Sequence, residues 1–471
     1  MKERIKSVVL VVLVITNLIL GSQVLSTKKL WSGDGYNFFV NMSNIPISIY
    51  RSIKQRISGK TPTETRLESP ELIIINTGYQ TSRHTLRSAD DDFAPLLEIA
   101  NAFLTDAFSR PQDFVSVPSD YFRTALTAKS VYLRYPTDYD SSLFAYLLGA
   151  GAGDFSQSFS QLRNIVISAD GYVYIEDSLS GTVYRIRTTE STDELNSVIN
   201  LHITNDDTYA PVINYAFDLG FDKAFETQKT VLSPMIPIYS EGFERETVTA
   251  KQILVSQNGN IAETAISAIL PHFSMNPNGL RRYTEVDGTI VFVENNSLLK
   301  ISNDGYIEYQ AKDEGIQLSK GTAVSVHESV AAIASFVDKI NRAAGSDSTM
   351  QLTSKLTASE LSGNTITITL DYLANGSLVR LSDANSHSVT VTVTNGRITS
   401  YRHLMRSFET NAEMVSVDDY IYALDNAIAR FENQINEIEI SGLEIVYEYD
   451  GSQSELIPEW HVSVKEIVIN E

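Results

Sequence analysis

The chain has 471 residues, 43% of them hydrophobic and 20% charged, so it can build sizeable cores but is too long for one domain. It has no cysteine, which excludes disulfides, thiol nucleophiles and cysteine metal sites. Its net charge of −21 is uneven, because residues 1–68 hold ten Lys and Arg against four Asp and Glu. The strongly acidic remainder argues against nucleic acid as a partner.

The first predicted element is an uncharged apolar run, Ser7–Leu25. As a helix it spans about 28 Å, close to the roughly 30 Å hydrocarbon core of a bilayer. Basic residues at positions 2, 4 and 6 precede it, which places the N-terminus in the cytoplasm. We therefore predict a cytoplasmic tail over residues 1–6, a single transmembrane helix over 7–27 and an extracytoplasmic location for the bulk of the chain.

The competing interpretation of this run is a cleaved signal peptide. Val24 and Ser26 form a loose small-residue cleavage site. However, the run lacks an A-x-A pattern and exceeds the usual apolar core of a signal peptide, roughly 7–15 residues. Both features favour a retained membrane anchor.

One face of the predicted membrane helix has the residues of a helix–helix contact. Asn17 lies near the bilayer midplane, where an amide is costly unless it is bonded, usually to another helix. Gly21 follows on the same face and lets a second backbone come close, and Leu13, Val14 and Leu10 extend this face toward the cytoplasm. These five residues are the candidate partner-binding site. The alternative, a single tolerated polar residue, is equally compatible with the sequence.

A juxtamembrane linker is predicted over residues 28–68. Trp31 and Tyr36 lie where interfacial aromatic residues are expected. Ile45–Ile57 has the pattern of a short basic amphipathic helix, which suits either the lipid surface or the first domain. Residues 58–69 have the composition of a spacer.

The predicted N-terminal domain, residues 69–240, mixes helices and strands. Asp90, Asp91 and Asp92 precede its longest helix and are expected to cap it. The glycine-rich Gly149–Gly153 follows a helix and lacks a phosphate-loop ending, so it is not interpreted as a nucleotide site. The periodicity predicts strands or a meander over Glu71–Asn76, Ser130–Tyr135 and Asn164–Arg187, and helices over Asp92–Phe108, Ser119–Thr127 and Ser141–Leu148.

A middle domain, residues 241–315, and a C-terminal domain, residues 316–471, are predicted to follow. In the C-terminal domain, amphipathic helices over Ser325–Ala343 and Ser416–Phe431 are each followed by alternating strands, and Trp460 is expected to be buried. A helix laid on an antiparallel sheet, repeated, predicts α+β architecture. This part resembles the small PepSY-type modules of secreted and membrane-anchored bacterial proteins. The expected strands are Thr289–Glu294, Leu298–Ser302, Tyr306–Gln310, Thr365–Tyr372, Ser388–Thr394, Ile398–Phe408, Leu443–Tyr449 and Ile457–Ile469, with a further helix over Glu263–Leu270.

Three segments, together with the layout of the chain, resemble a known family. They are S-P-E-L-I-I-I at Ser69–Ile75, the stretch Tyr283–Val293 running on to N-D-G-Y-I-E-Y at Asn303–Tyr309, and L-I-P-E-W-H-V at Leu456–Val462. The layout and segments are similar to YycH, the accessory regulator of the YycFG (WalRK) two-component system of low-GC Gram-positive bacteria. The last segment also resembles the sister protein YycI.

The resemblance implies a non-enzymatic protein of cell-wall homeostasis signalling. Members associate outside the membrane with YycI and with the sensor histidine kinase, and they tune kinase activity partly through membrane-helix contacts. The linker over residues 28–68 is longer than expected for the family, which leaves the spacing between body and membrane open.

The sequence contains no recognisable catalytic or cofactor motif. Its seven His residues have no metal-ligand spacing, and there is no G-x-S-x-G elbow. We therefore expect no catalytic residue, no metal site and no cofactor. Three hypotheses remain: a membrane-anchored regulator of a sensor kinase, a PepSY-type binding or inhibitory module acting on an extracytoplasmic peptidase or wall enzyme, and a wall hydrolase with an unrecognised site.

Overall fold

The computed structural model describes residues 65, 67–78, 83–150, 158–204, 213–222, 230–239, 244–256, 259–276, 279–294, 296–312, 315–318, 325–383, 386–431 and 438–465. All of them belong to one compact unit, residues 46–471. The predicted tail, the predicted transmembrane helix and nearly all of the predicted linker lie outside these residues. In the part that is described, no helix is long and apolar enough to cross a membrane.

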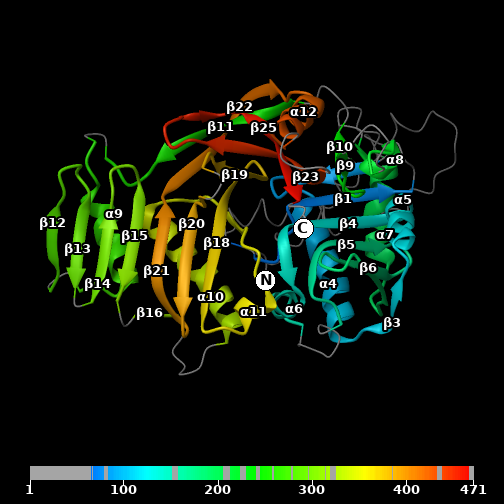
Figure 1. The fold of residues 1–471 in the computed structure, drawn as a ribbon, viewed down its shortest axis with the longest axis horizontal. Coiled ribbons are helices and arrows are strands. Elements are labelled where there is room, and N and C mark those ends of the chain that lie inside the picture. Colours follow the sequence, from blue (N-terminus) through cyan, green and yellow to red (C-terminus); the bar gives the residue numbers. More distant parts are fainter. Residues whose placement is uncertain are drawn as a thin grey trace, which may run out of the picture. The chain divides into compact units, whose positions relative to one another are not determined.

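The N-terminal part is a seven-stranded antiparallel sheet with helices on both faces (Figure 1). Its strands, in spatial order, are β2 (Arg83–Leu86), β1 (Leu72–Thr77), β4 (Lys129–Asp140), β5 (Gln161–Ser168), β6 (Tyr172–Asp177), β7 (Val183–Arg187) and β3 (Gln112–Val117). Its helices are α4 (Phe93–Ser109), α5 (Asp120–Thr127), α6 (Ser141–Leu147) and α7 (Asp193–Thr204).

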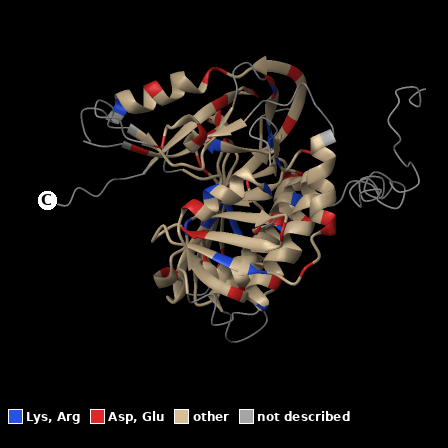
Figure 2. Cartoon of the chain, turned by 90° about the vertical axis from the view of Figure 1, so that its right-hand side faces the viewer, with Lys and Arg blue, Asp and Glu red and all other residues tan. Residues whose placement is uncertain are grey.

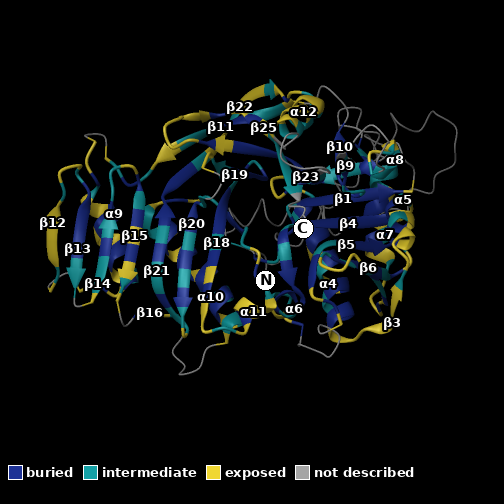
Figure 3. Ribbon diagram, in the orientation of Figure 1, coloured by how far each residue is buried: buried dark blue, intermediate teal, exposed yellow. Residues whose placement is uncertain are grey.

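The first strand shows why this sheet is covered on both sides. Successive side chains of a strand point to opposite faces, and every residue of β1 is buried, as Figure 3 shows. Ile73 and Ile75 belong to the core that includes α4 and α7, whereas Leu72 and Ile74 belong to a second core that includes α5. The continuous apolar run that identified this strand in the sequence therefore reflects burial on both faces.

The helix α4 lies within one residue of its predicted limits, and the predicted acidic run supplies its N-cap residue but not a side-chain cap. Asp92 is the N-cap residue and its side chain makes no capping hydrogen bond. The carboxylate of Asp90 instead accepts a 2.6 Å hydrogen bond from the backbone N–H of Arg87. The acidic run therefore orders the loop before the helix.

A 13-stranded sheet holds most of the remaining chain. Its main path runs β12 (Arg281–Thr284), β13 (Ile290–Glu294), β14 (Ser297–Ile301), β15 (Tyr306–Ala311), β21 (Arg397–Leu404), β20 (Val389–Thr394), β18 (Thr365–Ala374), β19 (Ser377–Leu381), β23 (Ile438–Tyr449) and β25 (Pro458–Lys465). The strands β16 (Ile316–Gln317), β17 (Met350–Leu352) and β9 (Thr230–Leu232) pair with β21, β18 and β23.

This sheet contains strands from all three predicted domains, because β9 lies in the predicted N-terminal domain and pairs with β23. The strand β15 comes from the predicted middle domain, and it is hydrogen bonded to β21 of the predicted C-terminal domain (Figure 1). The division at residues 315 and 316 therefore does not coincide with an edge of the sheet. The predicted α+β class is confirmed, because helices combine with mainly antiparallel strands throughout the described part.

The helix α10 (Val326–Ala344) covers the large sheet. Ser325 and Glu328 form a capping box at its start, and Gly345 ends it in a left-handed conformation. Val330, Ile333 and Val337 recur on one face and are fully buried. The shorter helices of this part are α9 (Glu263–Ile269), continued by the 3-10 turn η2 (Leu270–Phe273), and α11 (Ala358–Leu361).

Two small sheets and a last helix complete the described fold. The sheets are β22 (Arg406–Ser416), β11 (Glu244–Gln252) and β24 (Glu455–Leu456), and β10 (Pro237–Tyr239) with β8 (Ile213–Tyr215), which leads into α8 (Ala216–Leu219). The last helix, α12 (Tyr420–Phe431), begins four residues later than predicted, because β22 continues to Ser416 in pairing with β11. The predicted strand Ile398–Phe408 is likewise divided at Met405 between β21 and β22.

Trp460 is partly buried, so the expectation of a largely buried side chain is met in part. It lies on β25 against the core under α12, with its ring 5.6 Å from that of Tyr239. Its indole N–H donates a 2.7 Å hydrogen bond to the carbonyl of Asp418. The polar end of the ring therefore stays near the surface, as is usual for tryptophan.

A buried histidine lies in the core of the large sheet between two tyrosines. The Tyr372 hydroxyl lies 2.8 Å from Nε2 of His403 and donates to the carbonyl of Leu404 at 3.0 Å. Nε2 of His403 is therefore the donor to Tyr372, and the Tyr401 hydroxyl donates to Nδ1 at 2.7 Å. Burial lowers the pKa of His403 to about 3, so the ring is neutral at physiological pH.

This network predicts an acid-sensitive contribution to stability. Below about pH 6.5 the unfolded chain takes up a proton at His403, whereas the folded chain does so only near pH 3. The contribution is therefore complete above pH 6.5 and is lost as the pH falls, at up to about 1.4 kcal/mol per pH unit. In urea unfolding at several pH values, the wild type should lose stability relative to His403→Gln with this slope as the pH falls from 6.5 toward 3. Equal slopes in the two proteins would contradict the assignment.

Candidate functional site: the junction of the two sheets

The first described residues form a segment that links the two sheets; we call residues 65 and 67–71 the entry segment. The Asp338 carboxylate on α10 accepts a 2.6 Å bond from the Thr65 hydroxyl and a 3.2 Å bond from its N–H. Leu67 is buried, and its carbonyl accepts a hydrogen bond from the Tyr139 hydroxyl on β4. The carbonyl of Ser69 accepts a 2.9 Å bond from the Gln351 amide on β17. The chain therefore enters the fold by contacting both sheets.

The entry segment ends in a buried group of charges, the junction cluster, which consists of Glu71, Arg134, Arg163, Arg380 and Glu444. Arg134 on β4 lies between the two carboxylates, with Nε 2.8 Å from Glu71 and Nη2 2.5 Å from Glu444 on β23. Arg163 on β5 and Arg380 on β19 approach Glu444 at 3.1 and 3.6 Å. Both sheets therefore contribute charges to one cluster, in which each carboxylate is about nine-tenths buried.

The two carboxylates of the junction cluster have opposite pKa shifts. Burial raises the pKa of Glu71 to about 7, and the negative charge of Glu444 adds to this effect. Burial also opposes ionisation of Glu444, but Arg134, Arg163 and Arg380 outweigh it and lower its pKa to about 2. Glu444 is therefore the charge that holds the cluster together, and Glu71 is the partner that readily takes a proton.

A tight turn makes a second contact between the two sheets. Asn375 and Gly376 connect β18 to β19, both with positive φ, at 47° and 70°. A Cβ atom on Gly376 would lie 2.8 Å from Cβ of Arg87 and 3.1 Å from the backbone N of Ala89. The turn therefore presses against the loop after β2, and only glycine leaves room for that loop.

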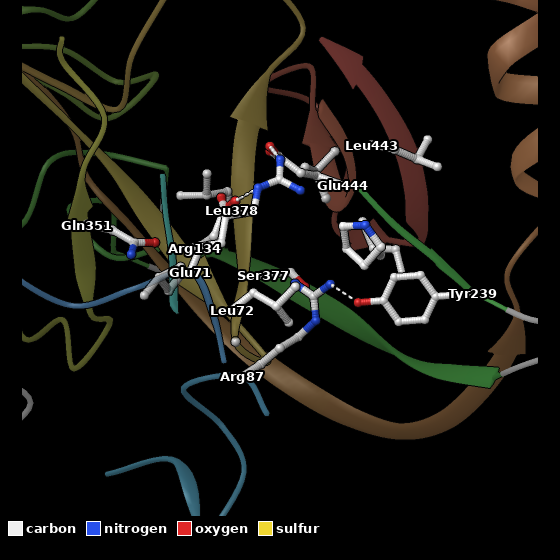
Figure 4. A pocket seen from close by; sticks show the side chains of 15 residues that line it. Glu71, Leu72, Arg87, Arg134, Tyr239, Gln351, Ser377, Leu378, Leu443 and Glu444 are labelled. Atoms are coloured by element: carbon white, nitrogen blue, oxygen red, sulfur yellow. Dashed lines mark hydrogen bonds and ion pairs between the residues drawn. The ribbon is translucent and has the colours of Figure 1, made fainter. Parts of the chain in front are cut away.

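A small cavity lies beside these contacts (Figure 4). It measures about 20 Å³, taken as the space open to the centre of a water-sized sphere, which suits about one water molecule. Its walls include Glu71, Arg87, Arg134, Tyr239 and Glu444. Ligand pockets for small organic molecules are roughly 300–1,000 Å³, so this cavity has no room for such a substrate.

One His–Asp pair in the described part has the orientation of a catalytic dyad. The Asp371 carboxylate lies 2.8 Å from Nδ1 of His387 and also accepts bonds from the Thr353 hydroxyl and the Ser388 N–H. A hydrolase needs a nucleophile at Nε2. No residue that the structure describes makes a hydrogen bond to Nε2 of His387, and no described group of His, Asp and Glu has the geometry of a metal site.

The charges of the described elements are mixed in sign. In the view of Figure 2, Lys and Arg lie among Asp and Glu over helices and strands alike. Several of the basic side chains are paired, such as Lys251 with Glu409 and Arg282 with Glu263. Basic residues interspersed with acidic ones along these elements argue against the clustered basic footprint that nucleic acid requires.

Comparison with solved structures identifies the fold. The crystal structure of YycH from Bacillus subtilis superposes with a TM-score of 0.54 at 13% sequence identity, covering 85% of this chain and 96% of that protein. The fold is YycH-like. An uncharacterized protein from Eubacterium rectale also aligns, with a TM-score of 0.31 and 9% identity over 55% of this chain and 87% of that one. No protein-family model and no curated protein sequence matches the chain.

The YycH-like fold agrees with the family resemblance seen in the sequence, at the level of architecture. The predicted partner-binding residues, Leu10, Leu13, Val14, Asn17 and Gly21, lie outside the described residues, so they stay a prediction. The junction cluster was missed in the sequence. The sequence feature that could have indicated it is a charged residue inside an otherwise apolar strand. This feature occurs in V-Y-L-R-Y for Arg134 and in L-E-I-V-Y for Glu444.

Proposed function

We propose that this chain is a membrane-anchored, non-enzymatic regulator of a sensor histidine kinase of the YycG (WalK) type. The observation that most supports this proposal is the YycH-like fold, which extends over 85% of this chain. In this proposal residues 7–27 span the membrane, residues 1–6 are cytoplasmic and the described part is extracytoplasmic. The partners are the kinase and a YycI-like sister protein, and the process is cell-wall homeostasis signalling.

The structure of the entry segment supports a mechanical role for the region outside the membrane. Thr65 lies near the end of the predicted linker, and it is bound to Asp338 of α10 before the chain reaches the junction cluster. In this proposal the entry segment is where the chain that comes from the anchor joins the described fold, and it leads to the place where both sheets meet. In this proposal the regulator acts through contacts of its membrane helix and of its extracytoplasmic part. Its C-terminal part is the region that we propose to be similar to PepSY modules and YycI.

A test of the membrane contact uses the predicted helix face. Asn17→Leu removes an amide hydrogen bond worth roughly 0.6–2 kcal/mol, so association with the kinase is expected to weaken about threefold to thirtyfold. Gly21→Leu should also weaken association, because it prevents close packing of the helices. The measurement is crosslinking of the full-length protein with its cognate kinase in membranes.

Ser22→Leu is the matched control, since position 22 lies about 100° from Gly21 and about 140° from Asn17 around a helix with 3.6 residues per turn, off the predicted contact face. It should leave association unchanged. Undiminished association in both Asn17→Leu and Gly21→Leu would place the interface in residues 69–471 and defeat the membrane-helix mechanism. Protease added to intact spheroplasts should digest the body of the protein; a protected body would overturn the topology.

A further inference from the structure

The side chain of Arg87 is buried at the junction without a carboxylate partner among the described residues. It is 6% exposed. Its nearest polar partners are the Tyr239 hydroxyl at 3.3 Å and the Ser377 hydroxyl at 3.4 Å, both longer than a typical N–H···O bond. Its Nε is buried and makes no hydrogen bond to any residue that the structure describes. Figure 4 shows the guanidinium between these two hydroxyls, on the wall of the small cavity.

The neighbouring carboxylates are already engaged by other cations. Glu444 is shared by Arg134, Arg163 and Arg380. Glu71 is paired with Arg134, and it is also the carboxylate whose pKa burial raises to about 7. The cavity itself is lined by two arginines and two glutamates, and Arg163 and Arg380, which also pair with Glu444, add positive charge beside it.

A further cation lies within electrostatic range of Arg87. Burial lowers the pKa of Arg245 on β11, and the charge of Arg87 lowers it further, which places the two guanidinium groups near each other. The negative charge of Asp90 acts on Arg245 in the opposite sense, but the Asp90 carboxylate is exposed and accepts the backbone N–H of Arg87. Glu71 is within electrostatic range of Arg87, but it makes no ion pair with it among the described residues, and burial raises the pKa of Glu71 to about 7, so it is only a partial countercharge. A buried charge without a partner costs several kcal/mol.

A second buried arginine, Arg406, shows that a guanidinium without a carboxylate partner can still have all of its nitrogens hydrogen bonded in this fold. Arg406 is 3% exposed and also lacks a carboxylate partner among the described residues. Its Nε donates to the Tyr449 hydroxyl at 2.7 Å, and its other nitrogens donate to the carbonyls of Asp304 and Met405 at 2.7 and 2.9 Å. Each of its nitrogens has a short bond, whereas those of Arg87 have long bonds or none.

We propose that the cavity beside Arg87 is a binding site for a monatomic anion, chloride, held by the Arg87 guanidinium and the Ser377 and Tyr239 hydroxyls. A space of about 20 Å³ suits one particle of about the size of water, which excludes phosphate, sulfate and organic carboxylates. Chloride supplies the negative charge that Arg87 lacks and bonds to Nε. Because its ligands come from the loop after β2, from β10 and from β19, the ion ties the two sheets together.

The test is the chloride dependence of thermal unfolding of the full-length protein in a non-ionic detergent. Chloride is replaced stepwise by gluconate, which is too large for the cavity, at constant ionic strength. Since a ligand that binds only the folded state stabilises it, the unfolding midpoint of the wild type should rise with chloride concentration. In Arg87→Gln the midpoint should be independent of chloride. An unfolding midpoint of the wild type that does not change with chloride concentration would overturn the proposal.

Arg406→Gln is the matched control, because it also removes a buried guanidinium. It should lower the midpoint but keep its rise with chloride, and a rise that persists in Arg87→Gln would place the ion elsewhere. Crystals of the wild-type protein soaked in bromide give a second measurement that does not depend on the folding of a variant. An anomalous peak beside Nε of Arg87 is expected, and its absence would contradict the site.

Discussion

Replacing Glu444 by glutamine should destabilise the protein by about 3 kcal/mol, at the lower end of the 3–5 kcal/mol seen when one partner of a buried ion pair is removed. The substitution leaves Arg134, Arg163 and Arg380 with Glu71 as the remaining carboxylate of the junction cluster. The loss is limited because Glu71 can then ionise: the repulsion that helps to raise its pKa comes from Glu444.

Glu71→Gln is the matched comparison and should cost no more than about 1 kcal/mol at neutral pH. A neutral amide resembles the protonated carboxyl that Glu71 holds below a pKa of about 7. Urea unfolding at pH 7 measures both variants. Equal losses, or a larger loss for Glu71→Gln, would contradict the assignment of Glu444 as the charge that holds the cluster.

The same pair predicts how stability changes with pH. The folded pKa of Glu71 is raised to about 7, so between pH 4.5 and 7 the folded state binds the proton that the unfolded state has lost, and stability falls as the pH rises. The folded pKa of Glu444 is lowered to about 2, so its contribution is present above pH 4.5 and is lost as the pH falls toward 2. Glu71→Gln should therefore gain stability relative to the wild type as the pH rises from 4.5 to 7, and a difference between the two proteins that does not change with pH would argue against the raised pKa.

The elements that the sequence predicted correctly are those whose own residues determine them. The amphipathic helix α10 carries its apolar face and its capping box within about twenty residues, and its limits were predicted to within one residue. The same holds for the meander of β5, β6 and β7, whose turns contain Asp170-Gly171 and Ser180-Gly181.

The elements that were missed depend on distant partners. The strand β11 has charged ends and little alternation, and it pairs with β22, which lies more than a hundred residues further along the chain. Its partner has exposed polar residues over most of its length, so neither strand has the local signature of a half-buried strand. Pairing that forms between two such segments cannot be derived from the pattern of either one.

The junction cluster was missed for a related reason. A charged residue inside an apolar strand is informative, because such a charge is rarely buried without a partner. The sequence places Arg134 and Glu444 in such strands, but their pairing depends on the arrangement of two separate sheets. By contrast, the Asn375-Gly376 turn was available from the sequence, since Asn-Gly between alternating residues is the strongest short-range signal of a β-hairpin.

A substitution in the Asn375-Gly376 turn should have the second large effect on the stability of the protein. Gly376→Ala should destabilise the protein by about 2–4 kcal/mol, the sum of a left-handed backbone that alanine disfavours and a steric clash. The added Cβ meets Cβ of Arg87 at 2.8 Å and the backbone N atoms of Ala89 and Ser88 at 3.1 and 3.2 Å. Because two of these atoms are backbone, no rotation of a side chain relieves the contact, and the loop that carries Arg87 must move.

Gly451→Ala separates the two causes. Gly451 also has a positive φ, 91°, but an added Cβ there meets no atom within 4 Å, so this variant should lose only the backbone term, about 1–2 kcal/mol. The difference between the two variants in urea unfolding measures the contact between the turn and the loop. A displaced loop also moves Arg87, so Gly376→Ala should weaken the chloride dependence that Gly451→Ala retains. If Gly376→Ala costs no more than Gly451→Ala, the turn does not press on the loop, and the two sheets are joined by the charges of the junction cluster without this second contact.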